Sequence, residues 1–465
     1  MKLSRRSFMG LSAATVGAVT VGAAALRGST ASAAKAPWHK GKVEKVYSIC
    51  ENCLWRCGIV ASVVNGRVHK VDGYAENPKS RGKLCPRGQG AVAQLYDPDR
   101  LKKPLIRVEG TKRGDGKYRE ATWDEALDLI ASRMQAIKKE HGPEAIAFFA
   151  HGTGDTWFAE HLPAAWGSPN AAKPSVTVCT AARETAAQWT FGRAIGGHEP
   201  IDWELTKYIV LVGHHIGEDT HNTQLQEFSE GLRRGARLVV VDPRFSTAAA
   251  KAHRWLPIKP GTDTALLLAW ANVLVTENLY DKQYVAKYTT GFDRLAAHVK
   301  QFTPEWAAKI TELDAADIRA VAREMAALRP RAVIPPSRHS VWYGNDTQRY
   351  RAMYIVNALL GNYGVEGGFH FAVSPYLEKF ATPPLPLEPA AGGCSGASGG
   401  DHEPEGYKPR ADKGKFFAKT TAIQELVEPM VTGEPYPIKG LIAYATSLFH
   451  AIPNVPRTKQ ALENL

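Results

Sequence analysis

Four cysteines near the N-terminus constrain the fold of this chain more than any other feature of its sequence. Cys50, Cys53 and Cys57 form a C-x2-C-x3-C loop, and Cys85 follows after 27 intervening residues, with Pro86 next to it. A cubane iron–sulfur cluster needs four thiolates around a small cage. A tight loop that supplies three of them, and a distant fourth followed by proline, meet that need. The spacing therefore predicts a [4Fe–4S] cluster in this region.

Two other uses of these cysteines stay open. Structural zinc also binds four thiolates, but zinc sites favour two CxxC pairs over three cysteines in one loop. Two disulfides would suit a protein outside the cytoplasm, although three cysteines within eight residues are poorly placed for two bridges. Six cysteines among 465 residues are also too few for a disulfide scaffold.

The first 33 residues have the pattern of an export signal. Arg5 and Arg6 stand in the run S-R-R-S-F-M, an apolar stretch rich in alanine, glycine and valine covers residues 9–26, and Ala31-Ser32-Ala33 offers a cleavage site. This pattern predicts export by the twin-arginine route and a soluble periplasmic chain. A membrane anchor is the alternative, but the apolar stretch is short and interrupted by glycines.

Composition excludes several classes of protein. With 44% hydrophobic and 22% charged residues, the chain has the make-up of a globular protein of about three domains rather than of a disordered, collagenous or coiled-coil protein. The net charge of +12 would suit nucleic acid, but no basic block with interleaved aromatic residues accompanies it. We therefore expect no nucleic-acid partner.

The rest of the chain reads as repeated βα units. Asn65-Gly66 is a hairpin signal between the short strands expected at 59–64 and 68–71, and Thr122 with Glu125 forms a capping box that opens a helix. Further strands are expected at residues 145–150, 208–213, 238–242, 332–334 and 441–445. Further helices are expected at residues 223–234, 264–276, 304–328 and 349–360. Continuous apolar strands between helices predict an α/β fold of doubly wound parallel sheets, with ligands at the carboxyl ends of the strands.

These patterns divide the chain into five parts. We expect a signal peptide over 1–33, a small β-rich iron–sulfur domain over 43–100, α/β domains over 101–381, a flexible glycine- and proline-rich insert over 382–413, and the incomplete start of a further α/β unit over 414–465. Cys394 lies in the insert and matches no site that we can assign, so we expect an incidental thiol there.

Cys179 is a second cysteine of interest. It lies among valines and threonines, where a lone cysteine is more often a small buried hydrophobic residue. In a chain that already carries a redox cluster, however, a lone thiolate is also a ligand for a soft metal.

Several motifs together resemble one family. They are the leader, the four-cysteine pattern, and the phrases Cys85-Pro86-Arg87-Gly88, Val241-Asp242-Pro243-Arg244 and Pro260-Gly261-Thr262-Asp263. In this order they resemble the molybdopterin oxidoreductases of the dimethyl-sulfoxide-reductase type. Closer similarity to the catalytic subunit of polysulfide or thiosulfate reductase lies in Phe149-Ala150-His151-Gly152, in Ser337-Arg338-His339-Ser340 and in residues 447–454.

The resemblance implies a role for several residues. Cys50, Cys53, Cys57 and Cys85 would hold the [4Fe–4S] cluster, and Arg87 would lie between the cluster and the pterin and help electron passage. A surface arginine is the alternative for Arg87.

The resemblance also implies a molybdenum site. Cys179 would bind molybdenum alongside the dithiolenes of two molybdopterin guanine dinucleotides. Asp242 would bind a guanine edge or ribose and Asp263 a guanine edge, since carboxylates accept hydrogen bonds from guanine N–H groups. Gly213 and His214 would bring backbone amides close to phosphates. A plain turn is the alternative at each of these positions.

His151 and Arg338 would lie at the substrate pocket, because each follows an expected strand. A guanidinium can hold a dianion such as thiosulfate, and a histidine can deliver a proton as sulfide leaves. Taken alone, each is more often structural, as a core histidine or a salt-bridged arginine.

The resemblance therefore implies an exported molybdenum oxidoreductase of anaerobic respiration that reduces polysulfide or thiosulfate. Its electrons would come from a ferredoxin-like iron–sulfur subunit and a membrane quinol-oxidising anchor subunit. Reduction of arsenate, tetrathionate or another oxyanion stays open, as does a molybdenum-free electron-transfer or scaffold role. Family members normally continue past the point where this chain stops, so we expect a fragment, a second chain that completes the fold, or incomplete binding of the cofactor.

Overall fold

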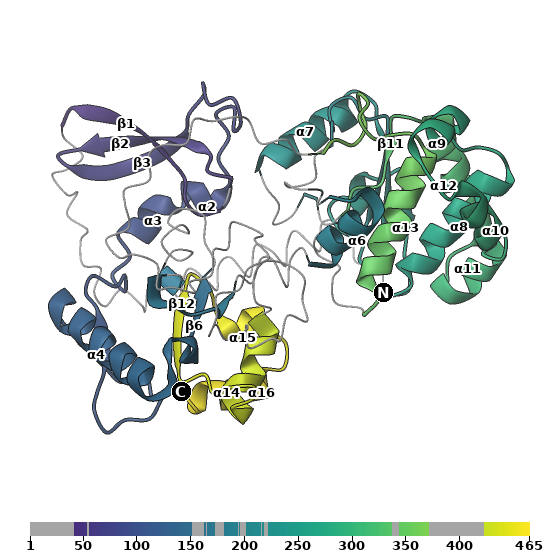
Figure 1. Cartoon of the computed structure of the whole chain (residues 1–465). Coiled ribbons are helices and arrows are strands. Elements are labelled where there is room, and N and C mark those ends of the chain that lie inside the picture. The colour runs from purple at the N-terminus through teal and green to yellow at the C-terminus, as the bar shows by residue number, and fades with distance from the viewer. Residues whose placement is uncertain are drawn as a thin grey trace, which may run out of the picture. The chain divides into compact units, whose positions relative to one another are not determined.

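The computed structural model shows an α/β protein (Figure 1). Its chain divides into two compact units. One unit holds the first three strands and the helices up to residue 97, and the other holds residues 98–465 together with residues 50–57. The structure describes residues 41–53, 55–150, 162–163, 165–172, 181–193, 195, 201–214, 216–217, 222–336, 344–371 and 423–465. The expected signal peptide and insert lie outside these residues.

The smaller unit is a β-rich domain, as expected. Strands β1 (Val43–Ile49), β2 (Gly58–Val64) and β3 (Arg67–Gly73) form an antiparallel sheet in that order, followed by the short helices α2 (Pro86–Gln89) and α3 (Ala91–Leu95). Asn65 and Gly66 join β2 to β3 with φ angles of 50° and 73°. Two positive φ angles in a two-residue loop are what the Asn-Gly signal predicts, so the hairpin is confirmed.

The main sheet of the larger unit is parallel and runs in the order β10-β9-β8-β11. Its strands are β8 (Tyr208–Val212), β9 (Arg237–Val241), β10 (Arg254–Leu256) and β11 (Ala332–Val333). Alternate residues of β8 face two separate cores. Val210 and Val212 pack with α8, α12 and α13, and Ile209 and Leu211 pack with α6 and α7. The sheet is therefore covered on both faces, as the continuous apolar runs predict.

Three of the helices around this sheet follow the expected ranges, one expected range is split into two helices, and the helices over 181–191, 282–288 and 292–299 were not expected. The helices are α6 (Ala181–Phe191), α7 (Asn222–Arg233), α8 (Asp263–Thr276), α9 (Lys282–Tyr288), α10 (Phe292–Val299), α11 (Pro304–Thr311), α12 (Ala315–Ala327) and α13 (Asp346–Leu359). The prediction of a single helix over 304–328 was wrong. Glu312 ends α11 in a left-handed conformation with φ of 62°, and the Asp314 carboxylate accepts a hydrogen bond from the Ala316 amide at 2.7 Å to start α12. A capping residue inside this range therefore starts a new helix, although the helical spacing of apolar residues continues across it.

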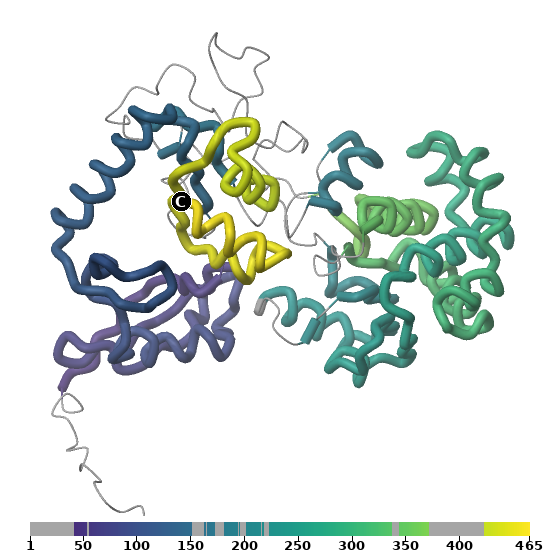
Figure 2. Tube along the Cα trace, turned by 90° about the horizontal axis from the view of Figure 1, so that it is seen from below, coloured from purple at the N-terminus to yellow at the C-terminus, as the bar shows by residue number. Residues whose placement is uncertain are grey.

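A second parallel sheet has the order β12-β6-β7. It is built from β6 (Ile146–Ala150), β7 (Ala171–Ala172) and β12 (Gly440–Tyr444). Strand β12 pairs with β6 over all five of its residues, so these segments lie side by side although they are far apart in sequence (Figure 2). The C-terminal segment thus joins the sheet of β6 instead of starting a separate one. Its helices are α14 (Val427–Thr432), α15 (Leu448–Ala451) and α16 (Val455–Glu463).

The capping box at residue 122 is confirmed. The Thr122 hydroxyl accepts a hydrogen bond from the Glu125 amide at 3.1 Å and starts α4 (Trp123–His141), which follows the hairpin of β4 (Leu105–Arg107) and β5 (Tyr118–Glu120). In the part of the chain that the structure describes, no helix has both the length and the hydropathy to cross a membrane.

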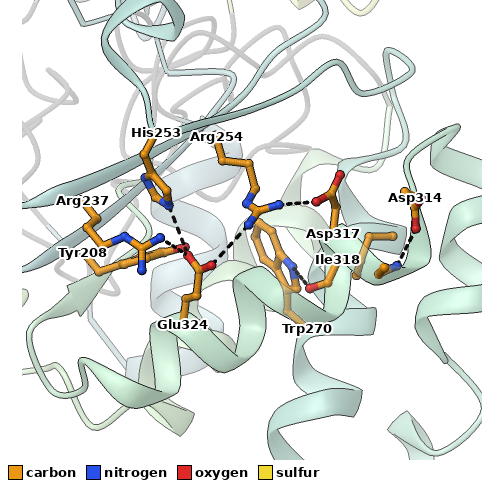
Figure 3. A network of polar contacts seen from close by, with 10 residues as sticks. Tyr208, Arg237, His253, Arg254, Trp270, Asp314, Asp317, Ile318 and Glu324 are labelled. Atoms are coloured by element: carbon orange, nitrogen blue, oxygen red, sulfur yellow. Dashed lines mark hydrogen bonds and ion pairs between the residues drawn. The ribbon is translucent and has the colours of Figure 1, made fainter.

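A polar network holds the amino-terminal edge of the main sheet (Figure 3). Tyr208, Arg237 and Arg254 each begin a strand, and all three reach Glu324 on α12. Polar and charged residues therefore tie this edge to a helix, and in folds of this kind ligands bind at the opposite, carboxyl-terminal edge.

Candidate functional site

The first three cysteines lie in a loop that a strand pair closes. Ile49 and Gly58 are the last paired residues of β1 and β2, and one residue further on the Cys50 amide donates to the Cys57 carbonyl at 2.8 Å. Within the loop the Arg56 amide donates to the Cys53 carbonyl at 3.3 Å, and Arg56 has a φ of 46°. The β-hairpin thus holds the first and third cysteine opposite each other, with the second in the turn between them.

Cys85 stands at the N-terminus of α2. Its carbonyl accepts from the Gln89 amide at 3.0 Å, and Pro86 occupies the first turn, where a missing N–H costs nothing. A Cβ at Gly88 would lie 2.5 Å from Leu84 Cδ1, so a larger residue there would displace the Leu84 side chain. Pro86 therefore starts the short helix that presents the fourth thiol, and Gly88 leaves room for Leu84 against it.

The surroundings of Cys85 favour its thiolate form. Burial raises the pKa of the thiol, but hydrogen bonds from the Gly88 amide and the Arg87 side chain, with the charge of Arg87, outweigh it and leave the pKa below its ordinary value. The thiolate is the form that binds iron. Arg87 therefore interacts with the Cys85 sulfur itself.

The donor set fits a [4Fe–4S] cluster. None of the four described cysteines is joined in a disulfide, which leaves all four as thiol ligands. The Cys50–Cys57 loop and Cys85 belong to different units, so the structure describes the two parts of the ligand set separately. Among the described residues no group of three His, Cys, Asp or Glu side chains is gathered closely enough to hold a metal ion, so the convergence of the four thiols stays a prediction.

The predicted dinucleotide residues lie at one edge of the main sheet. Gly213 and His214 directly follow β8, and Asp242 directly follows β9. The Gly213 amide donates to the Val241 carbonyl at 2.9 Å. Gly213 has a φ of 57°, a left-handed conformation that favours glycine. The Asp242 carboxylate accepts from the Arg244 amide at 2.8 Å.

Asp263 begins α8, the helix that follows β10. Burial raises the pKa of its carboxyl above the ordinary value. The negative charges of Asp346 and Asp242 raise this pKa further, and the positive charge of Arg349 lowers it by less than the total increase. Asp242 and Asp263 are therefore close enough to interact. The structure brings these expected residues to the carboxyl ends of neighbouring parallel strands, where the fold binds ligands.

Two charged residues at this edge were not predicted from the sequence. Asp346 and Arg349 lie in the first turn of α13, both are buried, and the Arg349 Nε lies 3.6 Å from the Asp346 Oδ1. An acidic residue in the first turn of a helix was a local signal for them. Carboxylates suit guanine N–H groups and a guanidinium suits phosphates, so the edge has the donors and acceptors that a guanine nucleotide requires.

The remaining predicted site residues, Cys179, His151 and Arg338, lie outside the described residues, as does Cys394. The strands before two of them are present. β6 ends at Ala150, immediately before His151, and β11 ends at Val333, five residues before Arg338. Their roles stay predictions.

Comparison with known proteins matches two sequence profiles. The profile described as Molybdopterin oxidoreductase matches residues 100–426, and the profile described as Molybdopterin oxidoreductase Fe4S4 domain matches residues 43–97. The second range includes the antiparallel sheet and Cys50, Cys53, Cys57 and Cys85, and the first includes the main parallel sheet.

Curated relatives are similar along most of the chain. The thiosulfate reductase molybdopterin-containing subunit PhsA of Salmonella typhimurium is 33% identical over 97% of this chain and 58% of its own length. The arsenate respiratory reductase molybdopterin-containing subunit ArrA of a Shewanella species is 28% identical over 91% of this chain and 53% of its own. The chain thus spans a little more than half the length of these relatives.

A solved structure supports the fold. Acetylene hydratase from Pelobacter acetylenicus superposes with a TM-score of 0.71 over 90% of this chain and 59% of that protein, at 24% identity. At this identity the likeness concerns the fold alone.

Proposed function

The chain belongs to the molybdopterin oxidoreductase family and carries the family's Fe4S4 domain, and from that premise we propose that it reduces polysulfide or thiosulfate to sulfide. The observation that carries the proposal is the similarity to a thiosulfate reductase subunit over 97% of this chain. The membership itself implies molybdopterin and a [4Fe–4S] cluster as cofactors.

The cofactors supply the redox chemistry when bound, the cluster by carrying single electrons and molybdenum bis(molybdopterin guanine dinucleotide) by exchanging electrons with the substrate. The protein positions them. Cys50, Cys53, Cys57 and Cys85 would hold the cluster, and Arg87, which donates to the Cys85 sulfur, would tune the charge at that ligand.

The carboxyl edge of the main sheet would hold the nucleotide ends of the molybdenum cofactor. Asp242 and Asp263 would accept hydrogen bonds from guanine N–H groups, and the backbone at Gly213 and His214 would bind the phosphates. Cys179 would be the protein ligand of molybdenum. The partly buried Asp263 carboxyl supports its role in binding guanine. Its burial costs free energy in the cofactor-free protein, and a hydrogen bond from a guanine N–H group would offset that cost.

Two side chains act on the substrate. Arg338 holds the negative charge of the sulfur anion, and His151 delivers a proton to the departing sulfide. For thiosulfate, cleavage of the S–S bond consumes two electrons and releases sulfite and sulfide. An arginine and a histidine match a reaction that begins with a dianion and ends with a proton-accepting sulfide.

We further propose that the twin-arginine pattern in residues 1–33 exports the chain to the periplasm. There it would receive electrons from a ferredoxin-like iron–sulfur subunit and, through that subunit, from a membrane quinol-oxidising anchor. The net charge of +12 with no basic block suits a peripheral protein held by partners and not by nucleic acid.

Metal analysis together with an acceptor screen tests this function. The protein, purified with its native partners, should contain about one molybdenum and about four cluster irons per chain. With a reduced viologen dye it should release sulfide from polysulfide or thiosulfate and should turn over arsenate or tetrathionate far more slowly. Iron without molybdenum would instead support a molybdenum-free electron-transfer subunit.

Two variants sharpen this test. Cys179→Ala should lose molybdenum and turnover but keep the iron, whereas Cys53→Ala should lose the iron. A Cys179→Ala protein with full molybdenum content and full turnover would refute the ligand assignment.

A second function has one observation in its favour. The arsenate respiratory reductase subunit is 28% identical over 91% of this chain, so the same cofactor residues would serve an arsenate reductase. Turnover of arsenate with no release of sulfide from sulfur anions would favour that function over ours.

A further inference from the structure

A cavity of about 710 Å³ lies among α6, α9, α10 and α13. Its α13 residues are Ile355, Ala358 and Leu359, at the C-terminal end of that helix, whereas Asp346 and Arg349 lie at the N-terminal end. A helix of 14 residues is about 20 Å long, so the cavity and the proposed nucleotide edge lie at opposite ends of it. The cavity is therefore not part of the site described above.

Aromatic rings form the walls of this cavity. The Phe191 ring lies edge-on to the rings of Tyr363 and Phe371, with centroid distances of 5.0 Å in both pairs, and the rings of Tyr284 and Tyr288 are also 5.0 Å apart. Walls of this kind can bind a flat aromatic ligand through edge-to-face and stacking contacts with its ring. The volume lies in the range of pockets that hold small molecules.

The residues that line the cavity carry no negative charge. Arg294 is one of them, with its guanidinium close to Gly291. Two more cations lie against lining rings, Arg193 at 5.1 Å from the Phe371 centroid and Lys287 at 5.0 Å from that of Tyr288. In the described part of the chain none of these three cations is in an ion pair.

Two acidic residues, Asp281 and Asp293, lie next to lining residues in the sequence or on the same helices, and neither lines the cavity. Asp281 caps α9 and accepts a hydrogen bond from the Tyr284 amide at 2.8 Å. The cavity therefore combines an aromatic interior with a lining arginine and with no carboxylate in its wall. This combination selects an anion with an apolar body and disfavours both cations and strongly polar molecules.

We propose that this cavity binds a small organic anion, a flat aromatic molecule with one carboxylate or sulfonate. Its ring lies between Phe191 and Tyr284 and its anionic group meets Arg294. The site is separate from the proposed reaction, so the proposed function can fail while this inference holds, and the reverse.

Fluorescence titration with two matched probes tests the inference on the purified chain. Anilinonaphthalene sulfonate has the aromatic body and the anion, and phenylnaphthylamine has the same body without the charge. The sulfonate should bind the wild-type protein more tightly than the amine. Arg294→Gln should weaken sulfonate binding about tenfold and leave the amine within about twofold, since only the charged contact is lost.

Two further variants separate this cavity from other apolar surfaces. Leu295→Trp should fill the cavity and abolish both signals, with an unchanged far-ultraviolet dichroism spectrum as the check on folding. Arg133→Gln is the control, because it lies on α4 next to a rival exposed apolar stripe with Leu127 at 55% and Ile130 at 49% exposure. It should leave the affinity of both probes unchanged.

Three results would overturn the inference. They are equal affinity of the wild-type protein for the two probes, sulfonate affinity unchanged by Arg294→Gln, and sulfonate affinity reduced as much by Arg133→Gln as by Arg294→Gln. The Arg294 result decides the question even if the tryptophan variant fails to fold, because Arg294 is exposed and its replacement leaves the core intact.

Discussion

Replacing Glu324 with glutamine removes one negative charge from the centre of the network at the amino edge of the main sheet (Figure 3). The carboxylate accepts from the Tyr208 hydroxyl at 2.6 Å and lies 3.2 Å from Arg237, 3.2 Å from His253 and 3.3 Å from Arg254. Three parallel strands are thereby tied to α12. Glutamine has the same size, so the change tests the charge and not the packing.

The expected loss is about 2 kcal/mol of unfolding free energy. A hydrogen bond to a charged group contributes about 1.5–3 kcal/mol and one between neutral groups about 0.5–1.5 kcal/mol, so the Tyr208 bond loses about 1 kcal/mol. The ion pairs with Arg237 and Arg254 are partly exposed and are worth about 0.2–1 kcal/mol each, which adds about 1 kcal/mol.

The loss should depend on pH with a definite sign. Burial raises the pKa of Glu324, but the hydrogen bonds from Tyr208 and His253 and the charges of Arg237 and Arg254 outweigh it, so the folded pKa is below the ordinary value. A lowered carboxyl pKa stabilises the fold above the unfolded pKa of about 4.3, and that stability is lost as the pH falls through the folded pKa. The difference between wild type and variant should therefore be full at neutral pH and shrink in acid.

Urea denaturation followed by tryptophan fluorescence measures this difference, since Trp270 is buried on α8 and its indole donates to the Ile318 carbonyl of α12 at 3.2 Å. Glu366→Gln is the matched control. Glu366 pairs with Arg331 at 3.0 Å but is 74% exposed, so its replacement should leave the midpoint unchanged. Equal effects of the two substitutions, or a Glu324 effect that grows in acid, would refute the reasoning.

Three further predictions concern the larger unit. Asn357→Leu should cost about 3 kcal/mol in urea denaturation, because the buried amide bonds both the N–H and the carbonyl of Ile334; no loss would contradict this. Gly231→Ala should cost about 2 kcal/mol despite a better helix propensity, because its Cβ would lie 2.2 Å from the Trp203 carbonyl oxygen; an unchanged melting temperature would contradict this. Asp263→Asn should stabilise the cofactor-free chain at neutral pH, where a carboxyl of raised pKa costs stability, with a gain that fades in acid. It should also lower guanine nucleotide content after purification, and unchanged content would contradict its assigned role.

The local signals of the sequence were reliable where neighbours along the chain decide the structure. The Asn65-Gly66 hairpin and the Thr122 cap formed as expected, because each depends on backbone angles and hydrogen bonds within a few residues. The wrong prediction of a single helix over 304–328 also concerns a local signal. The cap at Asp314 is readable in the sequence, but the apolar periodicity that continues past it obscured it.

Contacts between segments that are distant in sequence could not be predicted and became visible only in the folded chain. No pattern within residues 441–445 indicates that this strand pairs with β6, because any apolar strand can pair with several others. The proximity of Asp242 to Asp263, and the approach of Asp346 and Arg349 to them, follow only from the order of the strands in the sheet.

The sequence by itself determined the ligand chemistry of this protein, namely four thiols at cluster spacing and acidic residues after apolar strands, because residue type and spacing are properties of the chain. The tertiary structure alone decided which of these residues share an edge, which carboxylate ties the sheet to its helix, and where an aromatic cavity lies beyond them. The physical reason is that burial, electrostatic coupling and cavity shape arise between elements that are remote in sequence, and their free energies exist only once those elements are packed.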